Sequence, residues 1–198
     1  MAFLRRPGRP SLPDDVRRML QLGKGVRVLA WSPLVGGGWV VATVAGLRAL
    51  LPTGVLVDRP WTDVDHVTWD RDAAVLAVWW VGSRQPTTLD VGTESFLPEV
   101  VHERMRASLV LTREVGLPGG RTVRVVLRKA ADGTLSTQVV PGRGVRLADP
   151  QVAALVARAE AEIRAEAGAD DGAGGGRGGG GGRGDGSAAD AGPPPELW

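Results

Sequence analysis

The chain has 198 residues, 43% of them hydrophobic, and a formal net charge of +2, which suits one domain of ordinary size plus tails. It contains no cysteine, so disulfides, zinc–thiolate sites, iron–sulfur clusters and thiol nucleophiles are excluded. The same composition fits a reducing compartment, and we expect a cytoplasmic protein.

Charge is distributed along the chain as a patchwork. Residues 1–30 and 108–148 each carry a net charge of +5, whereas 31–107 carry −3 and 149–198 carry −5. The isoelectric point near 9.9 follows from the lack of tyrosine and the scarcity of lysine, because little titrates between pH 7 and pH 10. No single strong field therefore points to one charged partner.

The first expected element is a short helix over residues 11–22. A capping box, a first-turn proline and a terminating glycine occur in order: Ser11 with Asp14, Pro13, and Gly23. The basic residues before this helix are not followed by an apolar run, so no signal peptide is expected. We interpret residues 1–24 as an N-terminal arm that contains the helix.

A series of strands follows, separated by turn residues. The pattern predicts strands at Val26–Trp31, Trp39–Thr43 and Gly46–Leu51. Val55–Val57 either extends the third of these strands or begins a fourth. Residues 28–47 carry no formal charge over the length of a membrane helix, which is a rival interpretation. Gly36, Gly37 and Gly38 interrupt that stretch, so we expect a strand–turn–strand and no transmembrane segment.

Residues 59–81 are typical of an antiparallel hairpin. Two runs rich in valine, threonine and tryptophan flank a charged corner at Asp70-Arg71-Asp72. Four of the seven tryptophans lie in or beside this hairpin: Trp61, Trp69, Trp79 and Trp80. A further short strand is expected over 86–91. The fold class that follows is mainly β (α+β), built on a bent antiparallel β-sheet or barrel.

A helix is expected over 97–107, and Ser95 is suited to cap it. Three further strands form a predicted antiparallel meander, over 109–115, 121–129 and 135–140. The middle strand alternates valine and leucine with arginine, and Val126 is the exception. One face of this strand is therefore predicted to be packed, and the other, with Arg124 and Arg128, wet and cationic.

The last expected element is an amphipathic helix over 149–167. Asp149 suits the N-cap, Pro150 the first helical position and Gly168 the end. Its apolar stripe consists of Val152, Leu155, Val156, Ala159 and Ile163. We expect this helix to cap a single β domain over residues 25–167.

Neither histidine is accompanied by the partners that chemistry requires. His66 lies near Asp63, Asp65 and Asp70, but alternate strand positions point to opposite faces, so we expect a structural or surface histidine. His102 begins a zinc-type His-Glu pattern in which position 106 is arginine instead of the second histidine. No nucleophile elbow or phosphate loop is present. We expect no catalytic, cofactor-binding or metal-binding residue.

Residues 168–198 form a glycine-rich segment that we expect to be disordered. Two Arg-Gly pairs are offset by four aspartates, so a spacer is favoured over an RNA-binding tail. The segment ends in Pro-Pro-Pro-Glu followed by Leu197 and Trp198, an apolar pair on a stiff proline run. We keep the hypothesis that these residues are a docking peptide.

The order of elements resembles bacterial pleckstrin-homology-like proteins, and more narrowly uncharacterised actinobacterial proteins of that type. The resemblance covers roughly 25–167 and rests on the early strand pairs, the Pro60-Trp61-x-x-Val64 pattern, the Thr68-Trp69-Asp70 hairpin and the apolar run 74–81. It implies a strongly bent antiparallel sheet, nearly a barrel, closed at one end by a helix. Lipid-binding members carry basic residues on the first hairpin loop, whereas residues 33–38 here carry no charge.

The sequence leads to one preferred function and two alternatives. We expect a non-enzymatic cytoplasmic binding or scaffold module without a cofactor, whose partner is an unidentified protein. The first alternative is a nucleic-acid or anionic-lipid binder that uses Arg124, Arg128 and Lys129 on the Arg121–Lys129 face. The second alternative is an enzyme of unrecognised type.

Overall fold

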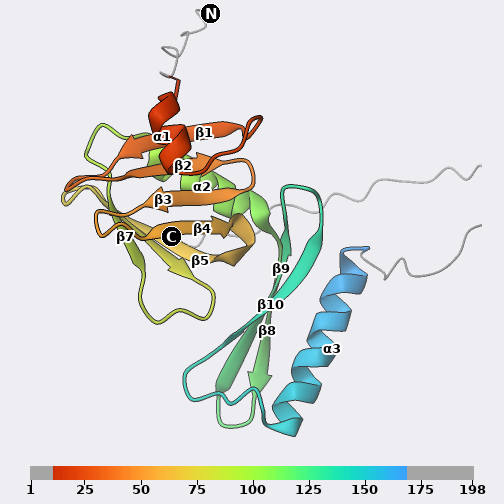
Figure 1. Cartoon of the computed structure of the whole chain (residues 1–198). Coiled ribbons are helices and arrows are strands. Elements are labelled where there is room, and N and C mark those ends of the chain that lie inside the picture. The colour runs from red at the N-terminus through yellow and green to blue at the C-terminus, as the bar shows by residue number, and fades with distance from the viewer. Residues whose placement is uncertain (1–10, 169–198) are drawn as a thin grey trace, which may run out of the picture.

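A computed structural model describes residues 11–168 of the chain. This part is mainly β, with three antiparallel sheets and three α-helices (Figure 1). The strands are β1 (Val28–Pro33), β2 (Trp39–Thr43), β3 (Gly46–Leu50), β4 (Leu56–Pro60), β5 (Val64–Asp70), β6 (Val75–Trp80), β7 (Thr87–Asp90), β8 (Leu109–Leu117), β9 (Arg121–Lys129) and β10 (Leu135–Pro141). The helices are α1 (Asp14–Met19), α2 (Leu97–Ser108), α3 (Pro150–Glu166) and a short 3₁₀ helix, η1 (Trp61–Asp63). The predicted disorder of the C-terminal segment lies outside the described residues.

The mainly β fold class is confirmed, but within residues 11–168 the strands do not close into a barrel. They form separate sheets with the orders β1-β2-β3-β4, β5-β6-β7 and β10-β9-β8. The buried side chains fall into three clusters, one of them between the first two sheets and another between the third sheet and α3. We call β1–β7 with η1 and α2 the first unit, and β8–β10 with α3 the second unit.

The core of the first unit is shared by both of its sheets and α2. Alternate residues of β2 and β6, such as Val40 and Val78, are fully buried in one cluster with Leu97 and Val101 of α2. Trp61 of η1 also lies in this cluster, and its indole nitrogen donates a hydrogen bond to the carbonyl of Thr43, at 2.9 Å. The tryptophans around the hairpin therefore contribute to this core, as their concentration in the sequence indicated.

The predicted hairpin over 59–81 is confirmed as the pair β5–β6. Asp70 organises its turn, because its Oδ1 accepts hydrogen bonds from the backbone nitrogens of Asp72 and Ala73, at 3.0 and 2.9 Å. Such an aspartate turn satisfies backbone donors that the ladder leaves free. The charged corner is thus explained by local structure.

The strand–turn–strand interpretation of residues 28–47 is also confirmed. The turn between β1 and β2 contains Gly38 at φ +91°, where an added Cβ would lie 2.1 Å from the carbonyl oxygen of Leu50. Only glycine fits there, for both conformational and steric reasons. Within residues 11–168, the structure contains no helix with the length and apolar character needed to cross a membrane.

The N-terminal helix is shorter than predicted and begins differently. Pro13, not Ser11, is the N-cap residue of α1, and no side chain caps the helix. The helix ends before Gly23, because Gln21 already adopts a positive φ of 52°. The predicted capping box is therefore wrong. Instead, α1 is held by packing, with Val16 and Leu20 buried in a cluster with Val41 of β2.

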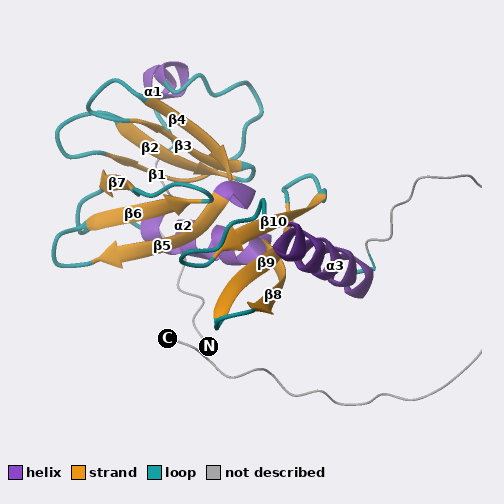
Figure 2. Ribbon diagram, turned by 90° about the horizontal axis from the view of Figure 1, so that it is seen from below, coloured by secondary structure: helices purple, strands orange, loops and turns teal. Residues whose placement is uncertain are grey.

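The predicted meander and the last helix are confirmed in the second unit. Asp149 caps α3, its Oδ1 accepting a hydrogen bond from the backbone nitrogen of Gln151 at 2.9 Å. Four of the five residues of the predicted stripe are buried, whereas Leu155 is 38% exposed. Within the described residues, α3 packs on β8 and β9, and α2 covers the core of the first unit (Figure 2).

Candidate functional site

The arginine-bearing face of β9 is directed at the first unit instead of at solvent. Val123, Val125 and Leu127 face α3, and the alternate positions face α2 and β5. Arg128 is only 4% exposed, and its guanidinium donates to the Ser108 hydroxyl at 2.9 Å and to the Gln138 side-chain oxygen at 3.0 Å. The expected open cationic face is therefore wrong at Arg128.

Gln138 and Val126 complete this contact between the two units. The two residues pair across β9 and β10, and the Gln138 amide nitrogen also donates to the carbonyl of Thr62 in η1. Val126 is 3% exposed, so it interrupts the polar alternation because its face of β9 is buried. Val126, the apolar residue at a position where the alternation predicts a polar one, was the sequence signal that this face of β9 is buried.

Burial lowers the pKa of Arg128 from its ordinary value, and the Arg124 charge acts in the same direction, whereas the Asp65 charge opposes them. A guanidinium starts from a very high pKa and keeps its proton in proteins, so we treat Arg128 as a buried cation. In residues 11–168 no buried side-chain nitrogen or oxygen lacks a hydrogen-bond partner. The network is thus a satisfied structural contact.

The other predicted interaction residues lie in different surroundings. Arg124 is partly exposed and pairs with Asp65 of β5, with 2.5 Å between Nη2 and Oδ1. Lys129 is exposed. Leu197 and Trp198 lie outside the described residues. The three described residues therefore differ in their surroundings: Arg128 is buried, Arg124 is paired with Asp65, and Lys129 is exposed.

Neither histidine belongs to a group of described side chains that could bind a metal ion. The His66 ring stacks on Trp79 with 5.3 Å between ring centroids, and its Nδ1 lies 2.9 Å from Oδ2 of Asp65. His102 is exposed on α2. No group of three or more histidine, aspartate or glutamate side chains suited to a metal ion occurs over residues 11–168.

A hollow lies elsewhere, between β1 and the loop that joins β7 to α2. It has a volume of about 590 Å³ and is open to solvent. One wall is residues 30–33 of β1, and the other is residues 91–97. We call it the β1–α2 groove. Among residues 11–168 its lining is mainly apolar, and Glu94 is the one charged side chain.

Hydrogen bonds between the two walls hold the β1–α2 groove in shape. The Ser32 hydroxyl is buried and donates to the carbonyl of Val91 at 3.0 Å. Immediately beyond, the backbone nitrogen of Val35 donates to the carbonyl of Asp90 at 2.9 Å. These hydrogen bonds join the two segments that form the walls of the groove.

Phe96 is the most exposed of the large apolar side chains described, at 71%, and it stands at the wall of this groove. It occupies the N-cap position of α2, where serine, threonine, aspartate or asparagine is strongly preferred. The hydroxyl of Ser95 accepts the Leu97 backbone N–H instead, at 3.2 Å. A locally unfavourable residue that is also exposed points to a role outside folding.

Sequence reasoning missed the β1–α2 groove because its walls come from segments 59 residues apart. A weak signal was present, since Phe96 is one of two phenylalanines in the chain and ends a polar run of four residues, 92–95.

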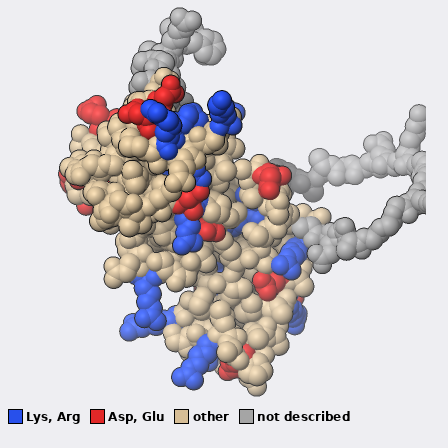
Figure 3. Space-filling view, viewed as in Figure 1, with Lys and Arg blue, Asp and Glu red and all other residues tan. Residues whose placement is uncertain are grey.

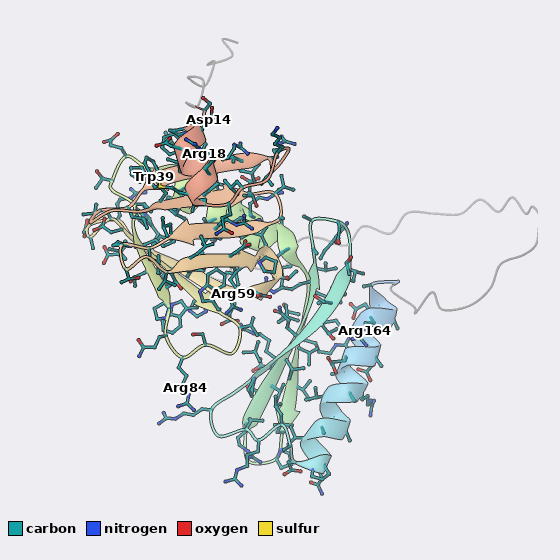
Figure 4. The ribbon with its side chains drawn as sticks, in the orientation of Figure 1. Asp14, Arg18, Trp39, Arg59, Arg84 and Arg164 are labelled. Atoms are coloured by element: carbon teal, nitrogen blue, oxygen red, sulfur yellow. The ribbon has the colours of Figure 1, made fainter. Side chains whose placement is uncertain are left out.

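On the face shown in Figure 3, basic side chains lie in small groups interleaved with acidic ones. Figure 4 shows Arg59 beside the first two sheets, where its guanidinium lies 5.8 Å from the centroid of the Trp80 ring. Comparison with protein-family models, with curated proteins and with solved structures finds no match.

Proposed function

We propose that the chain is a non-enzymatic cytoplasmic protein-binding module, and that the β1–α2 groove receives an extended apolar segment of a partner protein. The observation that carries this proposal is Phe96, a 71% exposed aromatic side chain beside a preformed apolar groove. Exposed aromatic side chains beside apolar depressions are the usual anchors of protein interfaces. The groove has a volume of about 590 Å³ and lies between β1 of the first sheet and the segment that leads into α2.

The chemistry of the groove favours a peptide over a reacting substrate. Its polar side chains are Ser32, Thr93, Glu94 and Ser95. Ser32 and Ser95 are already hydrogen-bonded within the protein, and no histidine, lysine or arginine of the described part of the chain lines the groove. A nucleophile or a general acid needs a neighbouring base or charge to activate it. An apolar segment, by contrast, binds by burying apolar surface away from water and needs no activated side chain.

A pleckstrin-homology-like architecture for the first unit is part of this proposal. It is supported by the succession of a four-stranded and a three-stranded antiparallel sheet, followed by a helix that covers their shared core. The turn between β1 and β2 carries no charged residue. Phosphate groups are recognised by arginine, lysine or clustered backbone donors, so this turn does not favour a lipid headgroup.

Binding of nucleic acid or anionic lipid through β9 ranks behind the peptide proposal. That function would use Arg124 and Arg128, but Arg128 is buried and Arg124 is paired with Asp65. Binding a phosphate at Arg128 would first break its buried hydrogen bonds to Ser108 and Gln138, which costs stability.

The test is a selection of random twelve-residue peptides on the immobilised chain, followed by affinity measurement on the variant Phe96→Ser. Serine suits an N-cap, so this substitution removes the aromatic ring while retaining or increasing helix stability. We expect the selected peptides to lose at least tenfold in affinity, and Val55→Ser, which changes a 54% exposed residue outside the groove, to leave binding unchanged. Failure to enrich any peptide, or equal binding to Phe96→Ser and wild type, would contradict the proposal.

A further inference from the structure

The β1–α2 groove lies close to the point where the described chain starts. Trp31 lines the groove and also packs against the cluster formed by α1 and its flanks. That cluster includes Leu12, which is 8% exposed and follows the first described residue. Figure 4 shows Trp39 of the same sheet next to α1, and the rings of Trp31 and Trp39 are 5.6 Å apart. Residues 1–10 therefore connect to the structure beside one wall of the groove.

The sequence of residues 1–10 matches the chemistry of the groove. It places the apolar pair Phe3-Leu4 immediately before Arg5 and Arg6. The groove is apolar with a single acidic side chain, Glu94, so an apolar pair followed by a cation complements it. The connection from Phe3 to Ser11 is long, because eight extended residues span up to about 28 Å.

We propose that Phe3 and Leu4 occupy the β1–α2 groove of their own chain, with Arg5 or Arg6 near Glu94. A partner segment then has to displace them. This inference rests on the proposed function in one respect, namely that the groove accepts an extended apolar segment. Because the competing segment is covalently attached, its effective concentration is in the millimolar range. An internal segment that fills the groove 90% of the time weakens the apparent affinity for a partner about tenfold.

The C-terminal docking hypothesis is the main competitor for the same groove. Leu197 and Trp198 form an apolar pair, but Glu196 precedes them and residues 149–198 carry a net charge of −5. The groove offers Glu94 and no cation to such a segment. In addition, residues 169–192 connect that pair to the second unit instead of to the groove wall. Charge and connectivity therefore both favour Phe3 and Leu4.

The lack of native cysteine allows a direct test by site-directed spin labelling. A nitroxide attached to Ala2→Cys in the full chain is expected to broaden the amide signals of residues 92–97. Tethering alone also brings the label near the groove, so the matched control is the same label in the variant Phe3→Asp with Leu4→Asp. We expect at least a threefold loss of the broadening in that control. A nitroxide at Gly192→Cys is expected to leave residues 92–97 unaffected.

Each outcome of this experiment decides the inference. Equal broadening with and without the Phe3 and Leu4 substitutions overturns it, and so does broadening of 92–97 from the label at position 192, which would place the C-terminal segment in the groove. The selected peptides distinguish a failure of the proposed function. If they bind through Phe96 but the double aspartate variant binds them no more tightly than wild type, the groove is a peptide site and the internal segment does not occupy it.

Discussion

The sheets β5–β7 and β8–β10 each have three antiparallel strands, but they are covered in different ways. The first shares a large core with β1–β4 and α2, and the loop that leads from β7 into α2 leaves an open apolar groove. The second has α3 on one face and meets α2 and β5 with the other, through Arg128 and Gln138. Both faces of the β8–β10 sheet are thus covered largely by other parts of the chain.

This difference separates residues that hold the molecule together from residues that are free to bind. The second unit is rich in charged contacts between its sheet and α3. Arg113 of β8 pairs with Glu162 and Glu166, at 2.5 and 2.7 Å, and Arg164 donates to the Thr137 hydroxyl at 2.8 Å (Figure 4). The basic residues of 108–148 therefore act largely inside the chain. The β1–α2 groove of the first unit is, by contrast, an open hollow with a mainly apolar lining.

The largest effect is expected for Leu127→Ala in the core of the second unit. Leu127 is fully buried between β9 and α3, so the truncation leaves a cavity and costs about 2–5 kcal/mol of unfolding free energy. Urea unfolding measures this loss. Leu155→Ala, at a 38% exposed position of α3, is the matched control and should cost less than about 1 kcal/mol. Comparable losses at the two positions would show that α3 packs by a different face.

Arg128→Met tests the contact between the two units. Methionine keeps an unbranched apolar chain but leaves the Ser108 hydroxyl and the Gln138 oxygen without their donor, at a cost of about 1–3 kcal/mol. Lys129→Met, one residue along the strand and exposed, should change stability by less than about 0.5 kcal/mol. Equal losses of stability for the two variants in thermal or urea unfolding would indicate that Arg128 is solvated like Lys129. The second unit would then not be held to the first through this arginine.

The smallest effect is a pH dependence at Glu162. A hydrogen bond from Arg158, then the charge of Arg158 and of Arg113, lower the pKa of this exposed carboxyl below its ordinary value. A carboxyl group with a lowered folded-state pKa adds stability above its unfolded pKa of about 4, and that contribution is lost as the pH falls through the folded value.

We therefore expect Glu162→Gln to be slightly less stable than wild type at pH 7, and the difference to vanish as the solution is acidified well below pH 4. Urea midpoints at a series of pH values measure it. Glu103→Gln, at an exposed position of α2, is the matched control. A difference that persists in acid would mean that the charged pairing is not what Glu162 contributes.

Local structure was predictable where short-range chemistry decides it. The bounds of β2 and β9, the Asp70 corner and the Asp149 cap follow from alternation, turn residues and capping. The start of α1 was not, because Ser11 offers a capping pattern that packing of Val16 and Leu20 overrides. Propensity is a weak prior where a buried face decides the position of a helix.

Contacts between distant segments were not predictable in the same way. Arg128 reads as a surface cation in the sequence, and only the position of Ser108 beside it makes it a buried one. The β1–α2 groove depends likewise on Ser32 reaching Val91 across 59 residues. No local sequence pattern specifies a contact between residues that lie so far apart along the chain. The two useful signals, Val126 and Phe96, were residues that broke a local rule.

Titration of the isotope-labelled chain with a selected peptide shows whether the β1–α2 groove or the β9 face is the binding surface. Amide chemical shifts report which of the two regions the peptide contacts. The account predicts perturbations concentrated at residues 30–33 and 91–97, and their loss in Phe96→Ser. Perturbations concentrated at residues 121–129, with the groove unchanged, would contradict it.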